Sequence, residues 1–137
     1  MGLEDNKTLA RRFYEEVVST GDVGRVEEFV APDYVEVHYG KRYAVGIEGV
    51  KEHVLGVRQT YVGLKITVQQ QIAEGDWVAS CIVAEGTHEG RWLDMEPTHG
   101  LVSFTGVNVD RVVDGRITEH GGAANMLLAR ANRPCRP

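Results

Sequence analysis

The chain opens with apolar side chains at the spacing of an amphipathic helix. They recur every three or four residues and therefore fall on one helical face. Their positions are Leu9, Phe13, Tyr14 and Val17. We predict a helix over residues 3–20 that ends at Gly21, because glycine readily adopts the conformation of a C-terminal cap.

A second, shorter helix is expected after Gly21, because apolar residues again recur on one side. These residues are Val23, Val26, Phe29 and Val30. Asp22 is the residue expected to cap the N-terminus of this helix. The two helices would form a hairpin that the segment Ala31-Pro32-Asp33 ends.

Alternation with a period of two predicts a strand over residues 34–39. Glu36 and His38 fall on one face of this strand, and apolar residues fall on the other. A third helix is predicted from Gly46 onward, because apolar residues again form a stripe. The stripe consists of Val50, Val54, Val57 and Tyr61.

From Leu64 the pattern is that of strands. A first strand alternates with Leu64, Ile66, Val68 and Ile72 on one face, and residues 77–86 are apolar on both faces, as in a central strand. After an irregular segment at 89–100, a long strand covers residues 101–113 and turns at Asp114-Gly115 into residues 116–120. Helices followed by antiparallel strands predict an α+β fold, with the helices packed on one face of a curved sheet.

Composition narrows the class of protein. The chain has 137 residues and a net charge of −5, from 15 basic and 20 acidic residues. The basic residues are scattered, which argues against a nucleic-acid partner. No apolar run reaches the length of a membrane helix, and the N-terminus does not resemble a signal peptide. We therefore expect a soluble, cytoplasmic protein with a single domain over residues 1–137.

The cysteines and histidines do not have the spacing of a metal or redox site. Cys81 lies in an apolar strand and Cys135 in the tail, without a Cys-x-x-Cys pair. No His-x-His or His-x3-His pair is present among the five histidines. We expect neither a metal nor another cofactor.

The turn at Asp114-Gly115 allows two registers for the last two strands. A two-residue loop pairs Val113 with Arg116 and would place Asp110 opposite Glu119, where like charges repel. A three-residue loop with a glycine bulge instead places Asn108 opposite His120. We favour the second register, which brings an amide and an imidazole together on one sheet face.

Several short segments, in order, resemble the SnoaL-like polyketide cyclase (ester cyclase) family, of the nuclear transport factor 2-like superfold. They are FYEE (13–16), TGD (20–22), APDY (31–34), GIEG (46–49), IAEGDWVA (72–79), GTHEG (86–90), EPTHG (96–100) and VDGRITEH (113–120). The resemblance covers nearly the whole chain. It implies a cone-shaped α+β barrel, with N-terminal helices packed against a curved, mostly antiparallel sheet.

The resemblance also implies an activity that needs no cofactor. A carboxylate would remove the α-proton of a polyketide ester, and the enolate would close a ring by intramolecular aldol addition. The family's base is an aspartate two residues after the histidine of the closing strand, and that position here is Gly122. A partner histidine of the family falls at Asn108. The catalytic residues must therefore be sought among other side chains.

His120 is the candidate general acid or base, and Asn108 is the candidate that orients it or stabilises an oxyanion. A strand-end histidine bonded to backbone is the alternative for His120. Asp110 shares a face with Asn108 and is either a replacement carboxylate or a structural acid. The candidate substrate contacts are His38, Trp92, Met95, Phe104 and Asn125.

Other polar residues are expected at the surface. Glu119 should lie on the opposite sheet face or at a dimer contact, and His53 on the polar side of its helix. His88 and His99 flank the Trp92 segment and are expected as exposed loop-end residues.

The expected partners are a small hydrophobic molecule and a second copy of the chain. Sheets of this superfold often pair face to face, which favours a homodimer. Two alternatives to a cyclase remain open. One is a binding module without catalysis, and the other is a different small-molecule enzyme on the same fold, of the isomerase or epoxide hydrolase type.

Overall fold

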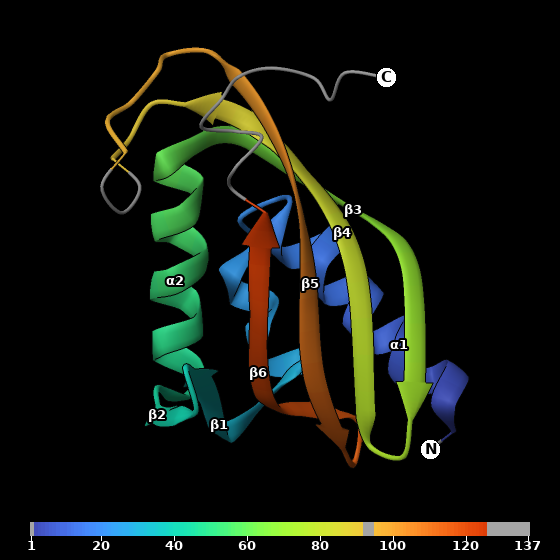
Figure 1. Cartoon of the computed structure of the whole chain (residues 1–137). Coiled ribbons are helices and arrows are strands. Elements are labelled where there is room, and N and C mark those ends of the chain that lie inside the picture. The colour runs from blue at the N-terminus through green and yellow to red at the C-terminus, as the bar shows by residue number, and fades with distance from the viewer. Residues whose placement is uncertain (1, 92–94, 126–137) are drawn as a thin grey trace.

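The computed structural model of the chain describes residues 2–91 and 95–125, with the backbone alone for Ala124 and Asn125. It confirms the predicted α+β fold, in which helical segments pack against one six-stranded sheet (Figure 1). The helical segments are α1 (Leu3–Arg12), η1 (Phe13–Val18), η2 (Val23–Glu28) and α2 (Gly46–Thr60).

The sheet is mixed but mostly antiparallel. Its strands are β1 (Val30–His38), β2 (Lys41–Ala44), β3 (Tyr61–Glu74), β4 (Trp77–His88), β5 (Leu101–Val113) and β6 (Arg116–Asn125). Their order across the sheet is β2-β1-β6-β5-β4-β3, and β1 runs parallel to β6. The last strand, β6, therefore lies between β1 and β5.

The first predicted helix is helical to Val18, but its second half is a π-helix rather than an α-helix. In η1 the Ser19 amide donates to the Tyr14 carbonyl oxygen, five residues earlier, at 3.0 Å. The wider turn brings two adjacent pairs of side chains into the core. These are Phe13, Tyr14, Val17 and Val18. Tyr14 lies in this π-helix, and short π-helices are frequent at functional sites.

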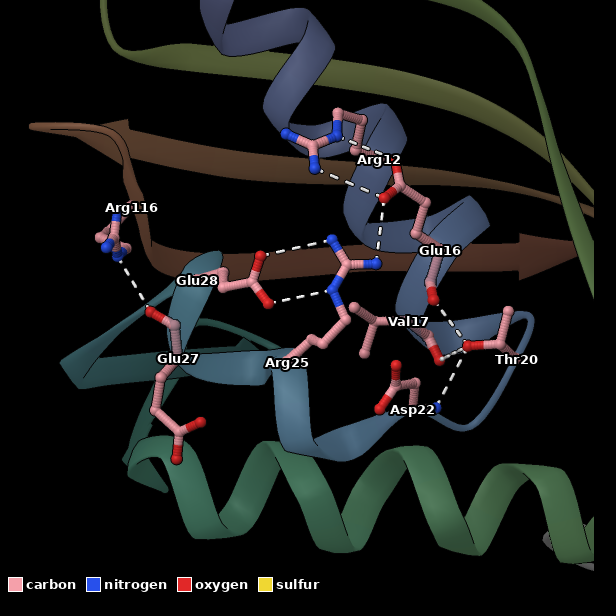
Figure 2. Close-up of polar contacts among 9 residues, drawn as sticks. All are labelled: Arg12, Glu16, Val17, Thr20, Asp22, Arg25, Glu27, Glu28 and Arg116. Carbon is pink, nitrogen blue, oxygen red and sulfur yellow. Dashed lines mark hydrogen bonds and ion pairs between the residues drawn. The ribbon is translucent and has the colours of Figure 1, made fainter.

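Charged side chains tie this helix to η2 (Figure 2). Arg25 binds Glu28 on its own segment and Glu16 on η1, and Glu16 in turn binds Arg12 at 2.8 Å. Asp22 makes no side-chain cap at the start of η2, contrary to our expectation. Surface ion pairs of this kind contribute little each, so burial of Val26 and Phe29 holds the hairpin in place.

The β1 strand begins at Val30, earlier than predicted, and includes Pro32. The pairing of β1 with β6 is irregular between Val30 and Val35, which accommodates a residue without an amide hydrogen. β2, which the sequence pattern did not reveal, is an edge strand of the sheet and pairs antiparallel with β1. From Tyr34 onward the predicted alternation holds, and Glu36 and His38 share a face.

A bulge in β3 changes which side chains face the core. The pairing with β4 shifts between Val68 and Gln70, so that Ile72 is 62% exposed instead of buried. Leu64, Ile66 and Val68 precede the bulge and are buried as predicted. A bulge inserts one extra residue and reverses the alternation beyond it.

The sheet thus has two distinct faces. We call the face that packs on the helices the inner face, and β4 contributes the buried Val78, Ser80, Ile82 and Ala84 to it. The outer face has no covering element among the described residues and carries partly exposed apolar side chains. Within the described residues, the helices are too short or too polar to span a membrane.

Candidate active site

The last two strands pair in a register that neither predicted loop provides alone. Asp114 and Gly115 have φ values of 51° and 74°, as a two-residue type I′ turn requires, and Val113 pairs with Arg116. Thr118 is then bulged out, because Ile117 pairs with Val112 whereas Glu119 pairs with Arg111. The bulge places Asp110, not Asn108, opposite His120.

Asp110 and His120 form a hydrogen-bonded ion pair on the inner face. His120 Nδ1 lies 2.6 Å from Asp110 Oδ1, and the Tyr14 hydroxyl donates to Asp110 Oδ2. Asp110 is 1% exposed, whereas the His120 side chain is 24% exposed. The carboxylate is therefore sealed from water, and part of the imidazole is accessible.

Tyr14 reaches this pair from the π-helix. Its ring is buried, and its hydroxyl also lies 3.4 Å from His120 Nδ1. Because the carboxylate of Asp110 accepts from both neighbours, Nδ1 of His120 carries a hydrogen. The other ring nitrogen, Nε2, has no hydrogen-bond partner in the described part of the chain.

Electrostatics favour the charged imidazolium. Burial alone would lower the pKa of His120, but the charge and hydrogen bond of Asp110, together with the charge of Glu36, raise it above the ordinary value. Burial and the Asp110 carboxylate raise the pKa of Tyr14 well above its usual range, so its hydroxyl stays protonated. The surroundings of His120 thus favour its protonated form, and those of Tyr14 favour a neutral hydroxyl.

Glu36 lies on the strand next to His120. The two residues are paired in the parallel β1–β6 register, so their side chains share the inner face. Neighbouring strands of a sheet lie about 4.8 Å apart. Tyr34 donates to Glu36 Oε1 at 3.3 Å, and His38 Nε2 lies 3.1 Å from Glu36 Oε2. His38 therefore lies beside the carboxylate of Glu36, which was not among the predicted candidates, and its role as a substrate contact stays a prediction.

His53 belongs to the same electrostatic environment, although it is exposed as predicted. Desolvation lowers its pKa, the positive charges of His120 and His38 lower it further, and the charge of Glu36 opposes them. The charges of Glu36, His38 and His120 therefore all act on His53 of α2.

Asn108 lies on the inner face of β5, two residues from Asp110, and pairs with Gly122. A Cβ atom at Gly122 would approach the Val107 carbonyl oxygen to 2.6 Å and Asn108 Oδ1 to 2.9 Å. The close passage of the two strands therefore requires glycine in this backbone. An aspartate could not occupy position 122 here without displacing β5.

Other predicted contacts lie elsewhere. Phe104 packs against Tyr61 toward the other end of β5, with ring centroids 5.4 Å apart, and Met95 is half-buried in the segment before that strand. Trp92 and the Asn125 side chain lie outside the described residues. Glu119 forms a bidentate ion pair with Arg42, as befits a residue that does not face the site.

The expectation for His88 was wrong. Its side chain is 0% exposed, and its ring stacks on Tyr61 with centroids 5.3 Å apart. Its Nδ1 lies 3.4 Å from the amide and hydroxyl of Thr98, which anchors the irregular segment to the sheet. His99 is exposed as expected and contacts Glu89.

A hollow of about 390 Å³ lies on the outer face, away from these groups. Its lining is mainly apolar and small, with Cys81, Thr105, Val107 and Ala123 contributing. None of the acid–base side chains reaches it. In the described residues, no three histidine, cysteine or acidic side chains converge as metal ligands. The inner-face group is therefore the candidate site.

The sequence carries signals for the residues of this site, including Glu36 and Tyr14, which were not among the predicted candidates. Asn108 and Asp110 interrupt the inner face of an otherwise apolar strand at consecutive inward positions. Glu36 does the same in the first strand, and Tyr14 places a polar hydroxyl within the apolar stripe of its helix. Polar groups on buried faces need partners, so these residues are expected to meet.

Sequence comparison assigns the chain to known relatives. Residues 8–131 match the family described as SnoaL-like polyketide cyclase. The nogalonic acid methyl ester cyclase of Streptomyces nogalater is 31% identical over 110 residues, which cover 74% of this chain and 78% of that protein.

Solved structures share the fold. AclR from Streptomyces galilaeus, provisionally assigned as a hydroxylase, is 26% identical with a TM-score of 0.79 and covers 99% of this chain and 87% of its own. IdmH from Streptomyces antibioticus, provisionally assigned as a polyketide cyclase, is 27% identical with a TM-score of 0.76, over 93% and 99% of the two chains. A SnoaL-like polyketide cyclase from Agrobacterium tumefaciens is 13% identical with a TM-score of 0.79 over 96% and 98%, a likeness of fold alone.

Proposed function

The chain belongs to the SnoaL-like polyketide cyclase family, and from that premise we propose that it is a cofactor-free acid–base enzyme acting on a polyketide-like ester. The substrate loses the proton next to its ester carbonyl, and the resulting enolate adds to a second carbonyl of the same molecule. Such a ring closure needs proton transfer, charge stabilisation and a site that folds the substrate.

The observation that carries this proposal is the buried pair of Asp110 and His120. The Asp110 carboxylate is 1% exposed and paired with His120, and buried ionisable pairs of this kind are frequent at functional sites. With Nδ1 held by Asp110, His120 presents Nε2 to the substrate. We assign it the transfer of a proton to the oxygen that gains charge as the ring closes.

The test is turnover of a panel of polyketide esters that includes nogalonic acid methyl ester, the substrate named for the Streptomyces nogalater relative. We expect ring closure by the wild-type protein and a loss of about 10²- to 10⁴-fold in His120→Gln and Asp110→Asn, the usual contribution of a general acid or base. Equal rates in all three proteins would refute the role of His120. Tight binding without turnover would instead support the alternative of a binding module.

We also propose that the working form is a homodimer built through the outer sheet face. The exposed apolar residues of that face support this proposal. They are Ile72, Trp77, Leu101, Val107 and Val109, with exposures between 37% and 71%. Exposed apolar patches of this kind mark interaction surfaces, and two copies of one face can cover each other around a two-fold axis.

A further inference from the structure

Glu36 is a second carboxylate at the site, and the roles assigned above do not use it. It lies next to His120 on the parallel neighbour strand, with its side chain 13% exposed. We propose that Glu36 is the general base that removes the α-proton of the substrate, while His120 is the acid. This inference rests on the proposed function and adds a catalytic residue to it.

The surroundings of Glu36 hold its carboxylate in place. The hydroxyl of Tyr34, a residue that is 5% exposed, donates to Oε1, and His38 contacts Oε2. A carboxylate has about four lone-pair positions, so two contacts leave room to accept a substrate proton. Burial and the charge of Glu36 raise the pKa of Tyr34, which therefore remains a donor.

The chemistry of the neighbouring groups selects Glu36 as the base. Asp110 holds the Nδ1 hydrogen of His120, and the charges of Asp110 and Glu36 raise the pKa of the imidazole, so His120 is better suited to donate a proton than to accept one. Asp110 is sealed from water, and both of its oxygens are engaged by Tyr14 and His120. Glu36 combines partial access to water with a position next to the acid.

The step balances without an external reagent. Glu36 takes the α-proton, and the electrons of the broken C–H bond form the enolate. The enolate carbon then bonds to the carbon of a second carbonyl, the π electron pair of that C=O bond moves onto its oxygen, and this oxygen takes the Nε2 proton of His120. Glu36 now carries a proton that His120 lacks. His38 contacts Glu36, and its side chain is 52% exposed, so it offers a route by which Glu36 loses this proton to solvent while His120 regains one from solvent.

The pH dependence of this pair involves every titratable group that faces it. From β1 these are Tyr34 and His38, from β6 His120, from β5 Asp110, from η1 Tyr14, and from α2 His53. The proposal predicts a bell-shaped rate profile, because the base must be ionised while the acid must be protonated.

The experiment compares Glu36→Gln with Glu119→Gln, using the ester that the wild-type protein turns over. Both glutamates have side chains that are 13% exposed, but Glu119 binds Arg42 and faces away from the site. We expect Glu36→Gln to lower kcat by about 10²- to 10⁴-fold with little change in KM. Glu36→Asp should keep part of the activity, and Glu119→Gln should match the wild type.

Two further measurements separate catalysis from folding. Exchange of the substrate α-proton with deuterated water should stop in Glu36→Gln, whereas His120→Gln should still exchange while failing to close the ring. NMR titration should show a lower His120 pKa in Glu36→Gln than in the wild type, because the charge of Glu36 raises that pKa. A Glu36→Gln protein that shows this shift is folded, so its loss of activity does not come from misfolding.

The outcomes distinguish the two proposals. Wild-type rates of ring closure and exchange in a folded Glu36→Gln variant, with His120→Gln inactive, would overturn the role of Glu36 and leave the proposed function standing. The role of Glu36 would likewise be overturned, and the proposed function would stand, if His120→Gln abolishes α-proton exchange and Glu36→Gln does not. Absence of turnover and exchange by the wild-type protein on every ester would overturn both.

Discussion

Burial and charge act on His120 in opposite directions, and charge prevails. Desolvation disfavours the imidazolium, but Asp110 and Glu36 stabilise it more and raise its pKa above the usual value of 6.5. A group whose pKa is raised by folding stabilises the folded state when protonated. This stabilisation is complete below the unfolded pKa and is lost as the pH rises through the folded pKa.

We therefore expect the free energy of unfolding to fall as the pH rises above about 6.5. Urea unfolding of the wild-type protein and of His120→Gln, followed from acidic to alkaline pH, measures the difference. The advantage of the wild type should shrink with rising pH, and Asp110→Asn should weaken this trend. A difference that stays constant across the range would contradict the linkage.

Tyr14 acts through Asp110. Its hydroxyl is one of the two donors to the carboxylate, and the whole side chain is buried. Tyr14→Phe keeps the ring but leaves one carboxylate oxygen without its donor, which should cost about 1–3 kcal/mol of stability. We also expect a lower kcat and a shifted pH–rate profile, because Asp110 would hold His120 less firmly.

The matched control for this variant is Tyr39→Phe. Tyr39 lies at the exposed tip between β1 and β2, where removal of a hydroxyl should change neither stability nor rate. Thermal unfolding together with a full pH–rate profile tests both residues. A Tyr14→Phe protein with the wild-type profile would show that the hydroxyl has only a structural role.

For the helices and strands, the sequence predicted the bounds of the strands better than it predicted which residues pair across the sheet. The bounds of β5 were predicted as residues 101–113, because alternation and the Asp114-Gly115 turn mark both ends. The register failed because neither the turn nor the pattern reveals the bulge at Thr118. The two-residue turn without the bulge would pair Asp110 with Glu119, and the favoured three-residue loop would pair Asn108 with His120. The turn and the bulge together pair Asp110 with His120.

The same limit applies to the other half of the site. The π-helical turn that aims Tyr14 at Asp110, and the parallel pairing that sets Glu36 beside His120, join segments far apart in the chain. Local periodicity predicts which residues of a segment share a face, as it did for Glu36 and His38. It carries no information about which inward residues meet across the sheet.

Gly122 can be tested as an element of strand packing. A Cβ atom at this position would lie 2.6 Å from the Val107 carbonyl oxygen, a contact that backbone movement alone can relieve. Gly122→Ala should therefore destabilise the protein by about 1–3 kcal/mol, as overpacking usually does. Chemical denaturation measures the loss.

Gly121→Ala is the control on the same strand. Its nearest contact would be the Val37 carbonyl oxygen at 3.3 Å, which a small adjustment can accommodate. A smaller loss is expected there. If Gly122→Ala is as stable as the wild type, β5 and β6 can separate at this point, and the glycine is then not required by the backbone.

In the whole molecule, the two faces of one sheet carry different kinds of side chain. The inner face of β1, β5 and β6 gathers Glu36, Asp110 and His120 beneath the helices. The outer face of the same strands carries Val107 and Val109 toward solvent, beside the hollow. Because side chains alternate along each strand, contact at the outer face can order the strands that position the site.

This arrangement predicts that disruption of the outer face separates the copies of the chain. Val107→Asp places a charge at the centre of that face, and we expect it to convert a dimer to a monomer in sedimentation equilibrium. Leu55→Asp is the matched control, because Leu55 is 46% exposed on α2 and Val107 is 42% exposed. The control should leave the mass unchanged. A wild-type protein that sediments as a monomer at all concentrations would refute the homodimer.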